Sequence, residues 1–268
     1  GLFRTELLFM NRGRKPSEEE QFEAYKKAAL ILKGRPLIIR TLDVGGDKDI
    51  PYLGLKKEEN PFLGFRGIRY CLKNEELFET QLRALVRASA YGDIRVMIPL
   101  VTGVWELRRV RSRIEQIMEE YASSGVDFNR NLKVGVMMET PAACMMADIL
   151  AKEADFFSIG TNDLTQYMMA VDRGNADVAY LYTTYDPAVL RAIQRVITCA
   201  KEAGIPVGMC GEAAADKRLI PLLIAFGLNE FSVNPASVLS TRRTIAMWSY
   251  KEAGELAEEA MALGTAEE

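Results

Sequence analysis

Short apolar runs alternate with longer helical patterns along the whole chain, and this alternation constrains the fold more than any other feature. Six runs predict complete strands, and Gly1–Arg4 predicts the end of a seventh. The six are Pro36–Asp43, Ile94–Val101, Lys133–Glu139, Phe156–Asn162, Pro206–Gly211 and Glu230–Asn234. Strands separated by helices are typical of β–α units around a parallel sheet. The sequence therefore predicts an α/β protein.

The helical patterns between these runs have recognisable ends. Ser17, followed three residues later by Glu20, predicts a capping box at the start of a helix over 18–33, which Gly34 would end. Proline at the first helical position and a closing glycine predict another helix within 186–204. Further helices are predicted over 74–91, over 104–122 and from residue 250 onward.

Seven strand signals in 268 residues come close to a (β/α)₈ barrel of the TIM type, which has eight strands in about 250 residues. Because the first signal is clipped, we expect the barrel to lack its first strand in this chain, with that strand upstream of Gly1. The chain would then be part of a longer protein. No low-complexity linker interrupts it, so a single domain over 1–268 is predicted. Its long segment 43–69 would be an elaborated loop, which is often functional.

Composition excludes several classes of protein. A formal net charge of −3 argues against a nucleic-acid or anionic-membrane surface. The four cysteines lack zinc-site spacing, and no apolar run approaches the roughly 18 residues of a membrane span. With no signal peptide at Gly1, the sequence indicates a cytoplasmic protein.

Polar residues stand repeatedly at the carboxyl ends of the predicted strands, where barrel enzymes carry their active sites. Any single one of them is more often a solvent-facing strand end. The agreement of the whole set indicates a site: Arg4, Arg40, Glu139, Asn162, Asp163, Cys210 and Glu212.

The residue types suggest how this site would work. Glu139 and Asp163 are hard oxygen ligands, enough to hold Mg²⁺ if the substrate supplies more oxygens; each could instead pair with an arginine. Cys210 would ordinarily be an inert small apolar residue, but beside a metal and several arginines its pKa would fall and it could move a proton.

Arginines and glycines add possible anion contacts. Arg4 and Arg40 end apolar runs, while Arg66 and Arg173 lie in glycine-containing loops and are weaker candidates; all four offer guanidinium forks that match phosphate and carboxylate. The Gly45–Gly46 pair could bring backbone N–H groups close to an anion. The chain contains no histidine, so a phosphoryl acceptor of that type would have to come from elsewhere.

Seven segments carry a family resemblance: GLFRTELLFM, RTLDVGGDKDIPY, ENPFLGFRGIR, GVMMETPAA, DFFSIGTNDLTQY, AVDRGN and GMCGE. They run in order from Gly1 to Glu212 and are similar to the phosphoenolpyruvate-utilising enzymes. Within that family, RTLDVGGDK and ENPFLGFRGIR most resemble the C-terminal domain of enzyme I of the phosphoenolpyruvate:sugar phosphotransferase system.

The resemblance implies a barrel that binds phosphoenolpyruvate and Mg²⁺, forms a homodimer and serves sugar uptake. The phosphoryl group would pass to a histidine of a separate N-terminal domain, and through it to the phosphocarrier protein HPr, releasing pyruvate. This chain alone would therefore bind the substrate without completing the transfer.

The resemblance also implies the role of each site residue. Glu139 and Asp163 would ligate Mg²⁺, and Cys210 would protonate the methylene carbon of the enolate. The residues implied to contact the substrate are Arg4, Arg40, Arg173 and Asn162, with Arg66 close by.

Three other interpretations remain open from the sequence. The chain could be the matching domain of pyruvate phosphate dikinase or phosphoenolpyruvate synthase. It could be a Mg²⁺-dependent lyase or aldolase barrel, although four arginines exceed what such a site needs. It could also be a non-catalytic phosphoenolpyruvate sensor.

Overall fold

The computed structural model describes residues 1–10, 12–45 and 50–268. These residues contain seven parallel strands in the order β1-β2-β3-β4-β5-β6-β7. A strand order that follows the chain, with helices between the strands, is the arrangement of a (β/α)₈ barrel represented by seven strands. The predicted fold class and all seven predicted strands are confirmed. The chain divides into two compact units: unit 1 contains residues 1–101 and 105–136, and unit 2 contains residues 102–104 and 137–268.

The strands of unit 1 bring two predicted arginines to one edge. Arg4 is the register partner of Arg40, the last residue of the neighbouring strand, and Arg40 in turn pairs with Met97. Because the strands are parallel, their carboxyl ends lie together. The strands are β1 (Leu2–Arg4), β2 (Leu37–Arg40), β3 (Ile94–Ile98) and β4 (Lys133–Met138), whose last two residues belong to unit 2.

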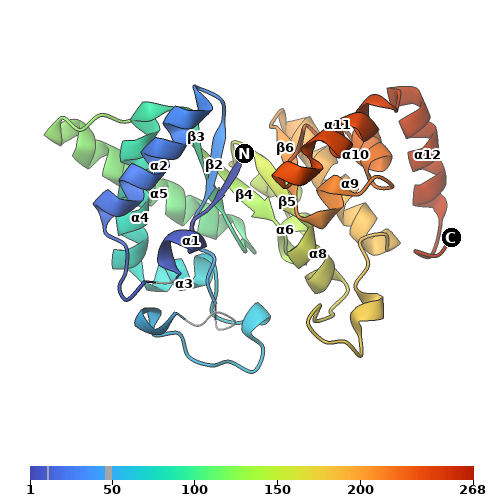
Figure 1. Cartoon of the computed structure of the whole chain (residues 1–268), viewed down its shortest axis with the longest axis horizontal. Helices are drawn as coiled ribbons and strands as arrows, with labels where there is room; N and C mark the ends of the chain where they lie inside the picture. The colour runs from blue at the N-terminus through green and yellow to red at the C-terminus, as the bar shows by residue number, and fades with distance from the viewer. Residues whose placement is uncertain (11, 46–49) are drawn as a thin grey trace. The chain divides into compact units, whose positions relative to one another are not determined.

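Helices of unit 1 cover the sheet, with α2 packed along α4 (Figure 1). The capping box predicted at Ser17 is present, since its hydroxyl accepts from the Glu20 N–H and the Glu20 carboxylate accepts from the Ser17 N–H. Tyr25 of α2 and Leu82 of α4 are fully buried. The elements are α1 (Glu6–Phe9), α2 (Glu18–Leu32), α3 (Ile68–Lys73), α4 (Glu75–Ala88), α5 (Val104–Ser124, its first residue in unit 2), η1 (Pro51–Leu53), η2 (Pro61–Leu63) and η3 (Ser89–Tyr91).

Unit 2 places Cys210 at a strand end. Its register partner is Gly160, the last residue of the adjacent strand. The next strand continues the same pattern, with Met209 opposite Phe231. The strands are β5 (Phe157–Gly160), β6 (Val207–Cys210) and β7 (Glu230–Phe231).

The helices of unit 2 also follow the sequence signals. The helix predicted within 186–204 begins at Pro187, with the Asp186 carboxylate accepting from the Ala188 N–H, and ends at Gly204, whose φ is +72°. Helix α12 packs against α10 (Figure 1). The elements are α6 (Pro141–Met145), α7 (Ala147–Leu150), α8 (Thr161–Met168), α9 (Pro187–Ala203), α10 (Ile220–Phe226), α11 (Val238–Ala246), α12 (Tyr250–Ala262), η4 (Ala179–Leu181), η5 (Glu212–Ala215) and η6 (Pro235–Ser237).

Several strands end earlier than the sequence-based expectation. The runs predicted to extend to residues 43, 101 and 234 end as strands at Arg40, Ile98 and Phe231. The strand predicted over 156–162 ends at Gly160, and Asn162 and Asp163 lie instead in the first turn of α8. Asp and Asn are weak strand formers that favour helix starts, which explains the early end. In the segment 43–69, Gly45 is described, whereas Gly46 lies outside the described residues.

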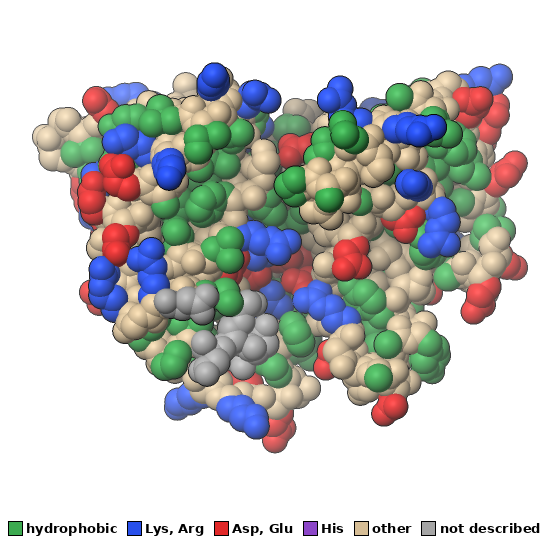
Figure 2. Space-filling view, in the orientation of Figure 1, with side chains coloured by type: hydrophobic (Ala, Val, Ile, Leu, Met, Phe, Trp, Pro, Cys, Tyr) green, Lys and Arg blue, Asp and Glu red, His purple; other side chains and the backbone are tan. Residues whose placement is uncertain are grey.

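Acidic and basic side chains are interspersed on the face of each unit that Figure 2 shows. In unit 1, for example, Arg87 pairs with Glu18 and Glu19 across α4 and α2. Among the described residues, no helix is both long enough and apolar enough to cross a membrane.

Candidate functional site

Four charged side chains form a buried cluster at the carboxyl end of β2 in unit 1. Asp43 accepts from the Arg66 guanidinium at 2.9 and 3.1 Å, and its Oδ2 lies 3.1 Å from Nη1 of Arg40. Arg40 also contacts Glu6, with 3.1 Å between Nη2 and Oε2. Glu6, Asp43 and Arg66 are each 5% exposed or less. We call these four residues the unit 1 cluster; with two cations and two anions, its formal charge is zero.

The backbone that carries this cluster is held by side chains from other elements. The Thr5 hydroxyl donates to the Arg40 carbonyl at 2.9 Å, and the Leu42 N–H donates to Oε1 of Gln81 at 2.9 Å. The Asp43 N–H donates to Oε1 of Glu6 at 3.0 Å, so Glu6 contacts both a guanidinium and the backbone. These backbone groups are therefore hydrogen-bonded at the point where the chain leaves the sheet. These hydrogen bonds hold in place the backbone from which the Arg40 side chain extends.

The predicted arginines of unit 1 therefore differ in their surroundings. Arg40 and Arg66 share a carboxylate partner, Asp43, so the structure brings these two together. Arg4 is exposed and forms no ion pair with any described residue, although its register places it beside Arg40. Glu6 and Asp43 were not singled out from the sequence.

In unit 2, Glu139 follows β4 and reaches toward the end of the next strand. It is 1% exposed. A Cβ atom added at Gly160 would lie 2.7 Å from Oε2 of Glu139, so the carboxylate lies directly over this glycine. Asp163 follows three residues later, in the first turn of α8. Glycine at position 160 therefore gives the Glu139 carboxylate its space.

Asp163 and Arg173, both predicted from the sequence, form an ion pair. Oδ1 of Asp163 lies 3.1 Å from Nη1 of Arg173, and Asp163 is 8% exposed. The Arg173 N–H donates to Oε1 of Gln166 at 3.1 Å, which ties the loop after α8 back to that helix. The Tyr182 hydroxyl, which was not singled out from the sequence, donates to the Asn162 carbonyl at 3.0 Å.

The Asn162 side chain has a fixed orientation. Its Oδ1 accepts from the Glu212 N–H at 3.1 Å. Gly211, just before Glu212, has a φ of +96°, and a Cβ there would lie 2.9 Å from Oδ1 of Asn162 and 2.4 Å from the Thr161 hydroxyl. Only glycine fits this backbone and this space. With Oδ1 engaged as an acceptor, the amide NH₂ is the donor that the side chain can offer to an anion.

Cys210 is buried at the end of β6, at 7% exposure. The Ser158 hydroxyl lies 3.8 Å from its sulfur, and the Thr161 hydroxyl donates to its carbonyl at 3.1 Å. Burial raises the pKa of the Cys71 and Cys199 thiols, and that of Cys144 to about 12, which disfavours proton transfer by these three residues at neutral pH.

The two carboxylates of unit 2 suit a hard cation whose remaining ligands are oxygen atoms of water or substrate. The described residues contain no group of three His, Cys, Asp or Glu side chains that could hold a metal ion by themselves. Glu139 and Asp163 provide two carboxylates, a number typical of Mg²⁺ sites completed by water and substrate phosphate.

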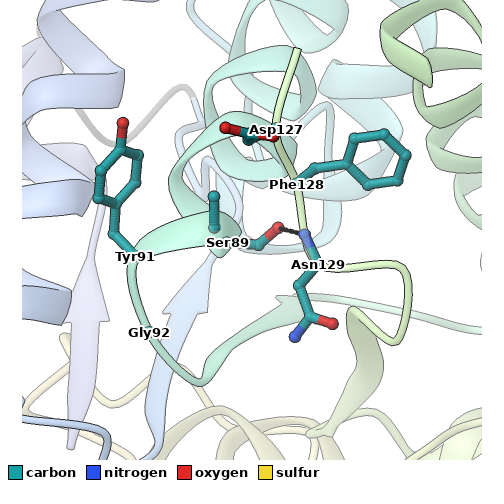
Figure 3. A pocket seen from close by; sticks show the side chains of 7 residues that line it. Ser89, Tyr91, Gly92, Asp127, Phe128 and Asn129 are labelled. Atoms are coloured by element: carbon teal, nitrogen blue, oxygen red, sulfur yellow. Dashed lines mark hydrogen bonds between the residues drawn. The ribbon is translucent and has the colours of Figure 1, made fainter. Parts of the chain in front are cut away.

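A pocket of about 540 Å³ lies elsewhere in unit 1 (Figure 3). Its lining comes from the segments that precede β3 and β4, and the Asn129 N–H donates to the Ser89 hydroxyl across it at 2.9 Å. It contains no Lys or Arg and none of the predicted site residues. The amino ends of barrel strands are associated with stability rather than catalysis, so this pocket is not the candidate site.

The family of the chain follows from comparison with known proteins. Residues 1–250 match the model of a family described as "PEP-utilising enzyme, PEP-binding domain". The chain belongs to this family. The resemblance to the phosphoenolpyruvate-utilising enzymes, and within them to the C-terminal domain of enzyme I, is therefore confirmed.

Curated relatives of the family match along the entire chain. A protein of Bacillus sp. (strain S) and one of Geobacillus stearothermophilus are each 51% identical over 268 residues, and one of Bacillus subtilis (strain 168) is 48% identical. All three are named phosphoenolpyruvate-protein phosphotransferase. The match covers 100% of this chain but 46 to 47% of each relative, so the chain spans about half their length.

Solved structures with a similar fold are more distant in sequence. Malate synthase of Haloferax volcanii matches in two structures, with TM-scores of 0.58 and 0.56 at 14% and 16% identity. The matches cover 91% and 92% of this chain and 64% and 62% of those chains. At such low identity the similarity supports the fold and carries no information about the reaction.

Proposed function

We propose that this chain is the phosphoenolpyruvate-binding part of a phosphoenolpyruvate-protein phosphotransferase. It would bind phosphoenolpyruvate with Mg²⁺ and pass the phosphoryl group to a histidine of a separate domain, releasing pyruvate. The observation that carries the proposal is the 51% identity along all 268 residues to relatives of that name. The phosphocarrier HPr as the next acceptor and a homodimeric assembly belong to the same proposal.

The arginines would bind the anionic groups of the substrate. Guanidinium groups match phosphate and carboxylate oxygens in a bidentate manner. Arg40 is already oriented by Glu6 and Asp43, and Arg4 stands beside it in the register. Arg66 binds Asp43 through several N–H groups, so we assign it to supporting Arg40 through that carboxylate. We assign an anion-binding role of the same kind to Arg173.

Glu139 and Asp163 would hold Mg²⁺. The buried carboxylate over Gly160 and the carboxylate in the first turn of α8 are the hard ligands of unit 2. When bound, the ion supplies charge neutralisation for the phosphoryl group and for the developing enolate oxygen. Arg173, now paired with Asp163, would then be available to the substrate. The Asn162 NH₂ would donate to a phosphate oxygen, as its fixed Oδ1 indicates.

Cys210 would complete the reaction by protonating the product enolate. The phosphoryl group leaves the enol oxygen for the histidine nitrogen, and the electrons of that broken bond stay on oxygen. The enolate then takes the thiol proton at its methylene carbon, which forms a C–H bond and the ketone, and sulfur keeps the S–H electrons as a thiolate. The Ser158 hydroxyl at 3.8 Å is placed to donate to that sulfur.

Calorimetry with phosphoenolpyruvate and Mg²⁺ tests the binding part of this proposal. The chain should bind the pair, and Arg40→Ala should weaken binding by about a hundredfold, since a buried charge contact of this kind contributes 2–5 kcal/mol. Arg130→Ala, at an exposed arginine beside Phe128, is the matched control and should bind like the unchanged chain. Absence of binding by a folded chain would count against the proposal.

The transfer itself requires a histidine, and the 268 residues contain none. Adding the histidine-carrying domain of a relative should restore phosphorylation of that histidine by phosphoenolpyruvate. Cys210→Ala should keep substrate binding while losing the exchange of pyruvate methyl protons with solvent. Undiminished exchange in that variant would show that Cys210 is not the acid.

A further inference from the structure

A series of buried hydrogen bonds connects the carboxyl end of β2 to the start of α2 in unit 1. Gln81, on α4, accepts from the Leu42 N–H at 2.9 Å through Oε1, and its Nε2 donates to the Tyr25 hydroxyl at 3.2 Å. That hydroxyl donates to Oε1 of Gln21 at 3.1 Å, and Nε2 of Gln21 donates to the Pro16 carbonyl at 3.3 Å. The series crosses between α4 and α2, which lie side by side (Figure 1). We call these bonds the Gln81 chain.

The direction of every bond in the Gln81 chain is fixed by the chemistry of its two ends. The Leu42 N–H can only donate, so the Gln81 oxygen faces it and the Gln81 NH₂ faces Tyr25. The phenolic oxygen accepts that bond and uses its single proton toward Gln21. The Pro16 carbonyl can only accept, so the Gln21 NH₂ faces it. No member can therefore reverse alone without placing two donors opposite each other.

The side chains of the Gln81 chain are shielded from water. Gln21, Tyr25 and Gln81 are each 1% exposed or less. Burial raises the pKa of Tyr25, so its hydroxyl stays protonated and keeps donating at neutral pH. The Tyr25 ring lies edge to face against Phe3 of β1, with 5.6 Å between the ring centroids. Because water cannot replace a broken bond here, each bond costs more to lose than a hydrogen bond at the surface.

The Gln81 chain ends on the segment that carries two members of the unit 1 cluster. Leu42 lies between Arg40 and Asp43, and residues 41–45 have no regular secondary structure. The Leu42 backbone is held on both sides, since its N–H donates to Gln81 and its carbonyl accepts from the Cys71 thiol at 3.5 Å. A shift of Leu42 would move both ends of the ion pair that joins Arg40 to Asp43 at 3.1 Å.

We propose that Gln81 is a positioning residue for substrate binding: through the Leu42 N–H it holds the segment of Arg40 and Asp43 in the arrangement that accepts the anionic substrate. This inference rests on the proposed function, in which Arg40 binds an anionic group of phosphoenolpyruvate. Gln81 is fully buried and acts through the backbone. Tyr25 keeps the Gln81 amide in the orientation that this contact requires.

Gln81→Met removes the amide and keeps an unbranched side chain of similar length, so the Leu42 N–H loses its acceptor. If the arrangement of Arg40 that accepts substrate falls to about one tenth of the molecules, the Kd for phosphoenolpyruvate rises about tenfold. Calorimetry in the presence of Mg²⁺ should show this rise. Leu82→Val is the matched control, because Leu82 is the next residue of α4 and is also fully buried. It should lower the midpoint of urea unfolding and leave the Kd unchanged.

Kinetics separate positioning from general loosening of the fold. With the histidine-carrying domain supplied, Gln81→Met should raise KM about tenfold and change kcat less than about twofold, because saturating substrate selects the competent arrangement. A merely structural role would lower the urea midpoint, as in Leu82→Val, and leave KM unchanged. In an Arg40→Ala background, Gln81→Met should have almost no further effect on the Kd. Independent effects of these two substitutions would overturn the inference.

Hydrogen exchange supplies a test without any ligand. The Leu42 amide should exchange at least about fivefold faster in Gln81→Met than in the unchanged chain. The Thr41 amide, which donates to the Met97 carbonyl at 2.9 Å, should change less than about twofold. Equal acceleration of the two amides would overturn the inference. If the unchanged chain fails to bind phosphoenolpyruvate, the proposed function fails; if it binds and Gln81→Met binds equally well, only the present inference fails.

Discussion

Replacing Asp43 by Asn should lower the free energy of unfolding by about 3 kcal/mol, because it removes one partner of a buried ion pair. Asp43 is 3% exposed and lies within 3.1 Å of guanidinium nitrogens of both Arg40 and Arg66. Asparagine keeps the size and one acceptor oxygen but replaces the other oxygen with a donor. Arg66 then loses the carboxylate that it contacts at 2.9 Å, whereas Arg40 retains Glu6. The remaining acceptor places the expected loss at the lower end of the usual 3–5 kcal/mol.

Urea unfolding followed by circular dichroism measures this loss, and Asp93→Asn provides the control. Asp93 also accepts two bonds from an arginine, at 2.7 and 3.1 Å from Arg95, but its side chain is 35% exposed. Solvent screening limits such a pair to below about 1 kcal/mol. Salt at 1 M should reduce the effect of Asp93→Asn much more than that of Asp43→Asn. Equal small losses in the two variants, or a loss at Asp43 that vanishes in salt, would refute the reasoning.

Three further predictions concern other parts of the chain. Gly211→Ala should weaken phosphoenolpyruvate binding at least about tenfold in calorimetry, because its Cβ would collide with the Asn162 amide, whereas Gly204→Ala, with open space around it, should bind normally. The hydrogen bond from Arg95 lowers the pKa of Asp93, so the stabilisation by this pair should be complete above the unfolded-state value near 4 and disappear as the pH falls through the folded-state value. Urea unfolding of Asp93→Asn beside the unchanged chain at pH 7 and pH 2.5 checks the sign. Cys144, buried and with its pKa raised to about 12, should resist iodoacetamide at pH 8 until urea is added, as mass spectrometry can show.

Local sequence signals predicted the elements of the fold well. The capping box at Ser17, the proline start at Pro187 and the glycine end at Gly204 each rest on contacts within a few residues. Such signals can be recognised without knowing the rest of the structure. The end of β5 was less predictable, because an apolar run followed by SIGTND is compatible with strand up to the point where the helix begins.

The charged environment of the arginines could not be predicted in the same way. Glu6 follows Thr5 in a short helix and would ordinarily be read as a solvent-facing acid. It is buried because Arg40 and the Asp43 N–H, more than thirty residues away, converge on it. No local pattern encodes this convergence. The metal and proton-transfer roles of Glu139, Asp163 and Cys210 remain predictions that the experiments above address.

The zero formal charge of the unit 1 cluster constrains how this part of the chain can change over evolution. Among these four residues, neutralising Glu6 or Asp43 alone leaves one more cation than anion, and neutralising Arg40 or Arg66 alone leaves one more anion than cation. Tolerated changes should therefore occur as compensated pairs, with strongly non-additive effects between the members. A library randomised at these four positions and selected for folding should recover mainly the original set or double replacements. The cluster would then be inherited as a block, which slows the divergence of this strand end relative to the surfaces around it.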